Sequence, residues 1–364
     1  MSNTNERKSQ KLLDAERYLK DLRQFVKQGE ESEYQYFSKE DIWIHGAFQQ
    51  EDYSQKENLL NYESTTSEKS NGLGDMIYGT QDSLALKYFV ENLSGEEEIF
   101  IDVGSSVKTM LFFSRFAKCF YVDPRHLGTA PVDEFYANTL GVAGVQAEGQ
   151  KLTEVFPEKC VNMVTSLHAP EHFGLGRYSD EIDYDGPVKF FKECNKVLKD
   201  DGTFIFSVPV SAVPRVEFHN ARVYNAAILE EMMQDSHFEP ESISLILGPP
   251  WLFNEISPDE TDEKIHYGKT KLDLKFELLN ADGESYQEAL TGIFPPSNVP
   301  DFDVDNIGWN EKQRTVRSYW NLDAGLPNWA EKCDNILNAI ENMGQSKLEH
   351  RCLLVVAKKR GDVT

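Results

Sequence analysis

The sequence predicts an α/β protein built on a doubly wound, mostly parallel seven-stranded sheet with helices on both faces. Two observations lead to this fold. Short apolar runs, typical of strands buried on both faces, recur along the chain, and segments with helical periodicity separate them. Because parallel strands need a crossover between them, this alternation favours a parallel sheet over a hairpin-based one.

The first element is an amphipathic helix within an N-terminal extension and linker, residues 1–75. Its apolar positions recur at helical spacing over residues 10–28, and Gly29 ends the pattern: Leu12, Ala15, Leu19, Leu22 and Val26. An aromatic stretch follows between Tyr34 and Phe48, for which packing against the sheet is the simpler interpretation and an acceptor-facing lid the alternative. The polar run at residues 64–72 is typical of a linker.

The catalytic core is predicted over residues 76–248. It starts with a helix over residues 82–93, with Asp82 as its N-cap. The expected strands are residues 99–103, 119–122, 161–166, 203–208 and 242–247. Further helices are expected over residues 187–198 and 226–234, and Pro187 suits a first helical turn while Gly202 suits the helix exit.

The remaining chain is interpreted as an insertion followed by the last strand. Residues 249–345 contain an alternating, hairpin-like stretch at 272–283 and a region rich in Pro and Trp, which we expect to bind the acceptor or to support oligomerisation. Residues 346–364 supply the terminal strand, at 352–357, and a tail. No internal repeat is visible.

Composition and charge exclude several classes of protein. The formal net charge of −24 would repel a phosphate backbone, so we expect no nucleic-acid partner. No apolar run is long enough for a membrane span and no signal peptide is visible, which predicts a cytoplasmic protein. The five cysteines lack a CxxC pair and are expected to be reduced core residues. A homo-oligomer is left open.

The chemistry-bearing motif begins where the 99–103 strand ends. Asp102, Gly104 and Ser105 form an acidic residue and a small-residue loop, which lets a ligand approach the backbone at the carboxyl edge of the sheet. Asp123 closes the next strand, where a carboxylate can accept both hydroxyls of an adenosine ribose. The GxGxxG pattern that seats a pyrophosphate is absent, which disfavours an NAD-dependent oxidoreductase. S-adenosyl-L-methionine has no phosphates and needs only such a loop, with an acidic residue facing its charged amino-acid end.

On these motifs the chain resembles the class I, Rossmann-like methyltransferases over residues 82–248 and again at 351–359. The resemblance implies S-adenosyl-L-methionine as cofactor and predicts the cofactor-binding residues Asp102, Gly104, Ser105, Asp123, Glu148, Gly149 and Leu167. Ser106 stands where a second glycine is common in the family. The segment 166–178 also resembles a poorly characterised bacterial methyltransferase-like family linked to surface-sugar modification, which points to O-methylation of a sugar, glycan or other small polar acceptor.

Candidate catalytic residues lie beyond the fourth predicted strand. His168 and His172 are the candidate general bases, because an imidazole can take a proton from a hydroxyl near pH 7. A structural or cofactor-contacting role is the alternative for each. Arg177, Tyr178 and His219 are candidate acceptor contacts, with loop anchoring as the alternative.

Two further alternatives remain open at this point. The acidic run at residues 180–185 has oxygen ligands suited to a divalent cation, but we interpret it as a solvated loop and predict no metal site. The chain is predicted to be an enzyme. A catalytically inactive methyltransferase-like scaffold that binds other proteins is the alternative, motivated by Ser106 and the long decorations.

Overall fold

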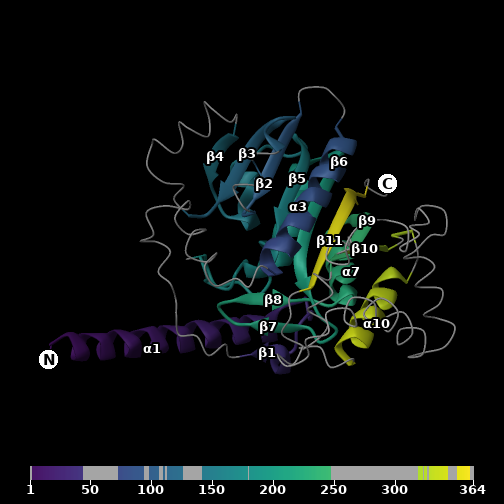
Figure 1. Ribbon diagram of the computed structural model, residues 1–364. Helices are drawn as coiled ribbons and strands as arrows, with labels where there is room; N and C mark the ends of the chain where they lie inside the picture. The colour runs from purple at the N-terminus through teal and green to yellow at the C-terminus, as the bar shows by residue number, and fades with distance from the viewer. Residues whose placement is uncertain are drawn as a thin grey trace, which may run out of the picture.

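The computed structural model describes residues 2–43, 73–93, 98–105, 110, 113–125, 142–178, 180–246, 319–322, 324–325, 328–342 and 351–360. Its main sheet has eight strands in the order β10-β9-β11-β6-β5-β2-β3-β4 (Figure 1). The strands are β2 (Ile99–Val103), β3 (Lys118–Asp123), β4 (Val142–Gln146), β5 (Val161–Leu167), β6 (Leu198–Val210), β9 (Phe238–Ile246), β10 (Tyr319–Leu322) and β11 (Arg351–Lys359).

The sheet is doubly wound, as predicted. Strands β2, β3 and β4 pair in parallel on one side of β2, and the chain then returns to place β5 and β6 on the other side, also in parallel. Strand β11 runs antiparallel to both β6 and β9. The winding direction therefore reverses between β2 and β5, and the carboxyl ends of these two strands lie at the position where such sheets bind ligands.

The predicted strand positions are confirmed, with two additions at the sheet edges. Strand β4 was not predicted because its sequence has only two large apolar residues, Val142 and Val145, and as an edge strand it is only partly buried. Strand β10 lies inside the predicted insertion and pairs antiparallel with β9, so it is an eighth strand beyond the seven expected. Gly202, expected at a helix exit, instead lies within β6, where it follows three exposed residues near the start of the strand.

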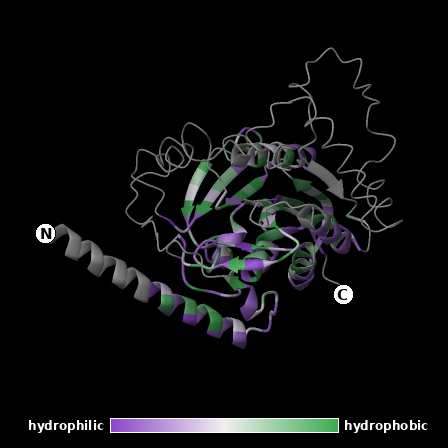
Figure 2. Ribbon diagram, turned by 60° about the horizontal axis from the view of Figure 1, so that its bottom comes forward, coloured by the Kyte–Doolittle hydropathy of each residue, from purple (hydrophilic) through white to green (hydrophobic). Residues whose placement is uncertain are grey.

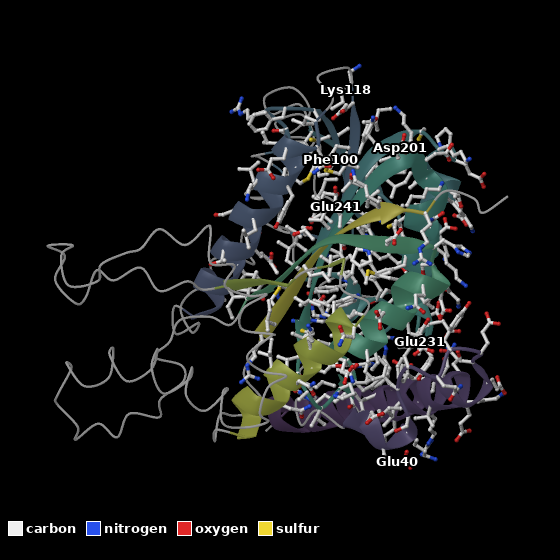
Figure 3. The ribbon with its side chains drawn as sticks, turned by 90° about the vertical axis from the view of Figure 1, so that its right-hand side faces the viewer. Glu40, Phe100, Lys118, Asp201, Glu231 and Glu241 are labelled. Atoms are coloured by element: carbon white, nitrogen blue, oxygen red, sulfur yellow. The ribbon has the colours of Figure 1, made fainter. Side chains whose placement is uncertain are left out.

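Helices cover both faces of the sheet. On one face lies α3 (Leu73–Glu91), and on the other lie α6 (Gly186–Val197), α7 (Ala226–Asp235) and α10 (Trp329–Asn342) (Figure 1). Hydrophobic residues concentrate on the strands between these layers (Figure 2). In Figure 3 the labelled charged residues Glu40, Lys118, Asp201, Glu231 and Glu241 are exposed, whereas Phe100 is buried beneath α3. Each face of the sheet thus has its own apolar core.

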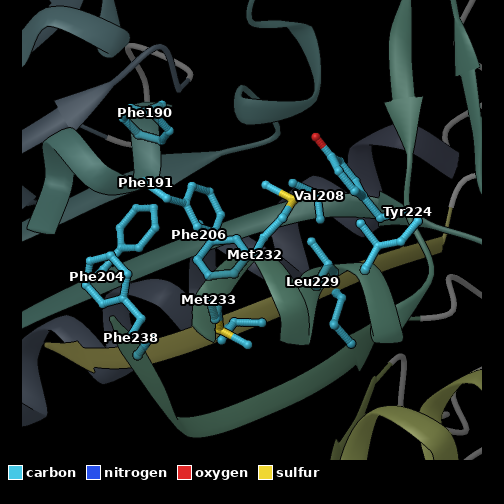
Figure 4. Close-up of a cluster of buried hydrophobic side chains, with 14 of the residues drawn as sticks. Phe190, Phe191, Phe204, Phe206, Val208, Tyr224, Leu229, Met232, Met233 and Phe238 are labelled. Carbon is cyan, nitrogen blue, oxygen red and sulfur yellow. The ribbon is translucent and has the colours of Figure 1, made fainter. Parts of the chain in front are cut away.

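The core under α6 and α7 is largely aromatic. Phe191, Phe204 and Phe206 pack together with ring centroids 4.8 to 5.0 Å apart, and Met232 and Met233 of α7 complete the cluster (Figure 4). Aromatic pairs at such distances add to the stabilisation from area burial. This packing fixes α6, and with it the segment that enters α6, against the sheet.

The helix at residue 82 was predicted too short. Helix α3 begins at Leu73, and Asp82 lies in its interior instead of at its N-cap. Its buried face includes Ile77 and Gln81 ahead of Leu84, so tertiary burial extends the helix past the local capping signal. Helix α6 has Pro187 in its first turn, as predicted.

The N-terminal extension packs on the core. Helix α1 spans Ser2–Glu31, two residues beyond Gly29, and its Phe25 is fully buried against Phe218. Strand β1 (Ile42–Trp43) pairs in parallel with β7 (Arg215–Glu217), which pairs with β8 (Ala221–Val223). Phe37 of the predicted aromatic stretch is buried against Tyr224, which favours packing over a lid.

The predicted insertion contributes to the sheet domain. Helix α10 packs on α7, and its Asp334 accepts hydrogen bonds from the first backbone amides of α7, Ala226 N at 2.6 Å and Ala227 N at 3.1 Å. The hairpin-like stretch at 272–283 lies outside the described residues. The predicted domain boundaries remain predictions.

The cysteines are free, as expected, and all but Cys160 are buried. Within the described ranges, no helix combines the length and apolarity that a membrane span requires.

Candidate functional site

The candidate site lies at the carboxyl ends of β2 and β5, the two strands between which the winding direction reverses. Asp102 lies opposite Tyr121 of β3 and Thr165 of β5 in the parallel register. We call residues 102–105 and 123–125 the β2/β3 edge, and residues 168–178 with 180–185 the post-β5 segment. The two meet above the carboxyl ends of β2 and β5, so the predicted cofactor and catalytic residues do converge.

Asp102 does not face outward. Its carboxyl group is fully buried, accepts a hydrogen bond from Thr165 Oγ1, and accepts another from the backbone N–H of Ser105 at 3.1 Å. Burial raises the pKa of Asp102 to about 7, against these hydrogen bonds, which lower it. Asp102 therefore organises the turn after β2 from beneath instead of presenting its charge to a ligand's amino group.

Gly104 and Ser105 form a tight turn that is tied to β5. Gly104 has φ +73°, and a Cβ there would lie 3.1 Å from Ala169 Cβ, so both conformation and space favour glycine. Ser105 Oγ accepts a hydrogen bond from Leu167 N at 2.7 Å, and Tyr121 donates to the Ser105 carbonyl at 2.9 Å. Leu167 is thus a neighbour of the loop through its backbone. Ser106 lies outside the described residues.

Asp123 is held by Arg125. The guanidinium contributes Nε to Asp123 Oδ1 at 2.8 Å and Nη2 to Asp123 Oδ2 at 2.5 Å, and the Arg125 backbone N–H also reaches Oδ1 at 2.8 Å. Tyr121 donates to Asp123 Oδ2 at 3.2 Å. Both carboxylate oxygens that would accept ribose hydroxyls are therefore occupied by a bidentate ion pair.

The predicted cofactor-binding residues Glu148 and Gly149 follow β4. Glu148 pairs with Lys151 at 2.8 Å. Gly149 is packed inside: an added Cβ would lie 3.0 Å from both Val103 and Phe190. The structure therefore explains Gly149 as a packing glycine, and Glu148 is the more accessible member of this pair.

Beyond β5, His168 is buried in an ionic contact. It has φ +50°, its backbone N–H donates to the Ser207 carbonyl at 3.0 Å, and its Nδ1 lies 3.0 Å from Glu171 Oε1. Burial opposes protonation, but the adjacent Cys352 sulfur and Glu171 carboxylate raise the pKa of His168 well above its ordinary value. His168 is consequently a charged partner of Glu171.

His172 is in the opposite state. Its Nδ1 lies 2.6 Å from the Asn220 carbonyl oxygen, a contact that requires Nδ1 to carry the hydrogen and leaves the lone pair on Nε2. Burial and the neighbouring Arg177 guanidinium lower the pKa of His172 to about 3. His172 is therefore a neutral imidazole with a free acceptor nitrogen.

Glu171, which was not among the predicted site residues, joins the two imidazoles. Its Oε1 lies 3.0 Å from His168 Nδ1 and 3.7 Å from His172 Nε2. Burial raises its pKa, but the charged His168, which is hydrogen-bonded to Oε1, lowers it below the ordinary value. Among the described residues, Glu171 Oε2 and His168 Nε2 are buried with no hydrogen-bond partner. The adjacent Glu171 and His172 were the signal in the sequence, since a carboxylate beside a histidine can change the pKa of the imidazole.

Arg177 and Tyr178 lie beside His172. Arg177 donates to the Asn220 carbonyl at 3.1 Å and to Asn220 Oδ1 at 3.0 Å. The Tyr178 ring meets the His172 ring edge-on, with centroids 5.5 Å apart. Tyr178 also receives the Arg125 guanidinium, 4.8 Å from its centroid. Arg125 therefore connects the β2/β3 edge to the post-β5 segment.

His219 is directed toward helix α1 instead. Its ring packs against Tyr18 at 4.9 Å, and its Nε2 lies 3.7 Å from Asp21. Burial lowers the pKa of His219. These contacts support the loop-anchoring alternative for this residue.

The post-β5 segment is held by residues that sequence reasoning missed. Arg222 of β8 is fully buried and donates to the backbone carbonyls of Phe173 at 2.6 Å, Tyr184 at 3.1 Å and Asp183 at 3.2 Å. Gln28 of α1 donates to the Ile182 carbonyl at 3.0 Å. An arginine in a short strand gives no sign that it will bind carbonyls of a loop 40 residues away in sequence, so only the tertiary structure reveals this role.

The acidic run within this segment has protein partners. Asp180 accepts backbone hydrogen bonds from Gly174 at 2.7 Å and Tyr178 at 3.1 Å, Asp183 pairs with Lys189 at 2.8 Å, and Asp185 accepts from Ser32 at 2.6 Å. In the part of the chain that the structure describes, no group of three His, Cys, Asp or Glu side chains is arranged to hold a metal ion. The run serves as loop caps and helix contacts.

No protein-family model matches the chain. No curated protein sequence matches it either.

Among solved structures, the [4+2]-cyclase SpnF is similar at 11% identity, with 77% of this chain and 81% of SpnF covered and a TM-score of 0.39. Geranyl diphosphate C-methyltransferase from Streptomyces coelicolor, solved with S-adenosyl-L-homocysteine, is similar at 10% identity, with 76% of both chains covered and a TM-score of 0.39. A sarcosine dimethylglycine methyltransferase candidate from Galdieria sulphuraria is similar at 12% identity, with 78% and 85% covered and a TM-score of 0.40. With all three TM-scores below 0.5, the fold assignment rests on the strand order and register of the sheet itself.

Proposed function

We propose that the protein is an S-adenosyl-L-methionine-dependent methyltransferase that O-methylates a small polar acceptor, such as a sugar or glycan. The observation that carries the proposal is the meeting of three features at one switch point: the Gly104 turn, the Asp123 carboxylate and the neutral imidazole of His172. The cofactor, when bound, supplies an electrophilic methyl group.

The residues present fit such a cofactor. The turn at Gly104 has no side chain between its backbone and a ligand, and Asp123 offers two carboxylate oxygens to a ribose diol once Arg125 moves aside. Asp102 holds the turn from below through Ser105. The absence of a pyrophosphate-binding glycine pattern in the sequence agrees with a ligand that lacks phosphates.

Of the two predicted bases, the environment favours His172. Two imidazoles whose surroundings move their pKa values apart take different roles, and only the neutral one can accept a proton. His172 Nε2 would take the proton of the acceptor hydroxyl as the oxygen attacks the methyl group. The resulting imidazolium would lie 3.7 Å from Glu171 Oε1, which stabilises it. We assign His168 a positioning role through Glu171.

Calorimetry tests the cofactor first. Wild-type protein is expected to bind S-adenosyl-L-methionine and S-adenosyl-L-homocysteine, and Asp123→Ala is expected to weaken both by tenfold or more, roughly the cost of losing two hydrogen bonds to a charged acceptor. If the wild-type protein binds neither compound, the proposal is wrong.

The base is tested with a panel of sugars and glycans, by following production of S-adenosyl-L-homocysteine. His172→Gln should lower kcat by roughly 10²- to 10⁴-fold, the usual contribution of a general base, without changing the dissociation constant of the cofactor. Because His172 is already neutral in the free protein, kcat/KM should show no acid limb between about pH 6 and pH 7. A His172→Gln variant with wild-type kcat would contradict the assignment of His172 as the general base.

One observation favours the alternative of a non-catalytic scaffold. Arg125 donates hydrogen bonds to both carboxylate oxygens of Asp123, as expected in a protein that no longer binds the cofactor. The same calorimetry separates the two functions, because a scaffold would bind neither cofactor compound even when Arg125 is replaced. We also propose a cytoplasmic location, since the cysteines are free thiols.

A further inference from the structure

We propose that Arg125, Tyr178 and Arg177 form an oxyanion subsite for the acceptor, and that Arg125 serves this subsite only after a ribose diol replaces it on Asp123. The inference rests on the proposed function and extends it, since it names the acceptor as a hydroxyl compound that also carries a carboxylate or phosphate group.

The first step is competition for Asp123. Arg125 donates to both carboxylate oxygens, and a ribose diol needs the same two oxygens. Asp123 is only 1% exposed with Arg125 in place. A cofactor and the Asp123–Arg125 pair therefore exclude each other, and cofactor binding must release the guanidinium.

The second step is where the released group goes. The Arg125 guanidinium already lies 4.8 Å from the centroid of Tyr178, a cation–π distance, so it can leave Asp123 and stay on this ring. Arg177 lies 5.3 Å from the same centroid. Two guanidinium groups beside one ring repel each other unless an anion lies near them. Once Arg125 has left the Asp123 carboxylate, an anion of the acceptor can take that role.

The third step is the chemistry of the anion. A guanidinium presents a planar fork of donors that matches carboxylate and phosphate oxygens in pairs. Within a chain of net charge −24, two arginines beside the same tyrosine ring locally offset the general repulsion of anions. The Tyr178 ring also contacts His172, so an anion bound here would hold a neighbouring hydroxyl close to the proposed base.

The first experiment measures cofactor affinity by calorimetry in wild type, Arg125→Gln and Arg125→Lys. If Arg125 competes with the ribose, Arg125→Gln binds S-adenosyl-L-homocysteine more tightly, by roughly tenfold, the order of one charge-assisted hydrogen bond, and Arg125→Lys falls between the two. Arg360→Gln is the matched control, because Arg360 is an ion-paired arginine at the far end of β11, and its affinity should equal wild type.

Affinity that is unchanged or weaker in Arg125→Gln overturns the inference while leaving the proposed function intact, provided that the wild type binds. If no variant binds, the proposed function itself fails. Melting temperatures of all variants show whether any change in affinity reflects loss of folding.

The second experiment titrates inorganic phosphate and acetate at constant ionic strength, with and without saturating S-adenosyl-L-homocysteine. At least one of the two anions is expected to bind only in the presence of S-adenosyl-L-homocysteine, and Arg125→Gln should lose that binding by tenfold or more, the cost of a bidentate contact. Preference for phosphate or for acetate identifies the group on the acceptor. Binding that does not depend on S-adenosyl-L-homocysteine or on Arg125 would contradict the subsite.

Discussion

The β2/β3 edge and the post-β5 segment meet at the carboxyl ends of β2 and β5 but are held in different ways. At the β2/β3 edge, the stabilising contacts come from neighbouring parallel strands: Thr165, Tyr121 and Leu167 all hydrogen-bond to the turn after β2. The post-β5 segment is held from remote elements, by Arg222 of β8 and Gln28 of α1. The first region follows from the sheet register, whereas the second requires the whole domain.

This difference indicates which of the two regions can change its geometry. A turn fixed by its own sheet keeps its geometry whenever the sheet forms, so it suits a constant ligand such as a cofactor. A segment held by the N-terminal extension and a small second sheet can change with those decorations, so it suits the acceptor. The following three predictions test whether the two regions depend on separate supports.

The largest effect is expected at Arg222. Arg222→Ala removes hydrogen bonds to three carbonyls and leaves a cavity, so the free energy of unfolding should fall by about 4 kcal/mol. Urea denaturation measures this change. Arg360→Ala, at a half-exposed arginine, should change stability by less than about 0.5 kcal/mol. An equal effect of both substitutions would show that the segment does not depend on Arg222.

Gly174→Ala should destabilise next most. Gly174 has φ +75°, and a Cβ would lie 2.0 Å from the Asp183 carbonyl oxygen, which predicts a loss of about 3 kcal/mol from strain and overlap. Gly79→Ala is the matched control, since nothing lies within 4 Å of its added Cβ and it sits inside α3. That variant should be more stable than wild type by about 0.5 to 1 kcal/mol. The prediction fails if thermal melting ranks the two variants in the opposite order.

The third expected effect is a pH dependence at Asp102, similar in size to the second. Burial raises the pKa of Asp102 in the folded state to about 7, above the unfolded value, so protonation of Asp102 favours folding. Its stabilising contribution is complete below about pH 4 and is lost as the pH rises to about 7. Relative to the isosteric Asp102→Asn variant, wild type should therefore lose roughly 3 kcal/mol across this interval.

Denaturation of both proteins at several pH values isolates this contribution, because every other titrating group is shared. A stability difference that stays constant from about pH 4 to pH 7 would show that Asp102 keeps an ordinary pKa.

Much of the sheet could be predicted from local sequence. Strand β2 was predicted residue for residue, because its apolar run is buried by helices on both faces and has no other stable location. Strand β4 and the start of α3 could not, since their burial depends on neighbours that the local pattern does not reveal.

For the candidate site, the sequence identified residue types at strand ends but not their partners. It predicted Asp123 as a ribose acceptor, but the bidentate contact with Arg125, only two residues away, depends on the path of the turn. It placed His168 and His172 together as equivalent bases. Their opposite protonation follows from Glu171, Cys352 and Arg177, which the fold brings to one histidine or the other.

The sequence by itself determined the winding of the sheet and the edge at which a ligand would bind, because hydrophobic periodicity and connection lengths leave few topologies open. Only the tertiary structure decided which side chains at that edge are ionised and which are neutral. Ionisation depends on burial and on atoms within a few ångströms. In this protein those atoms come from β11, from Asn220 between β7 and β8, and from the post-β5 segment, which are far apart along the chain.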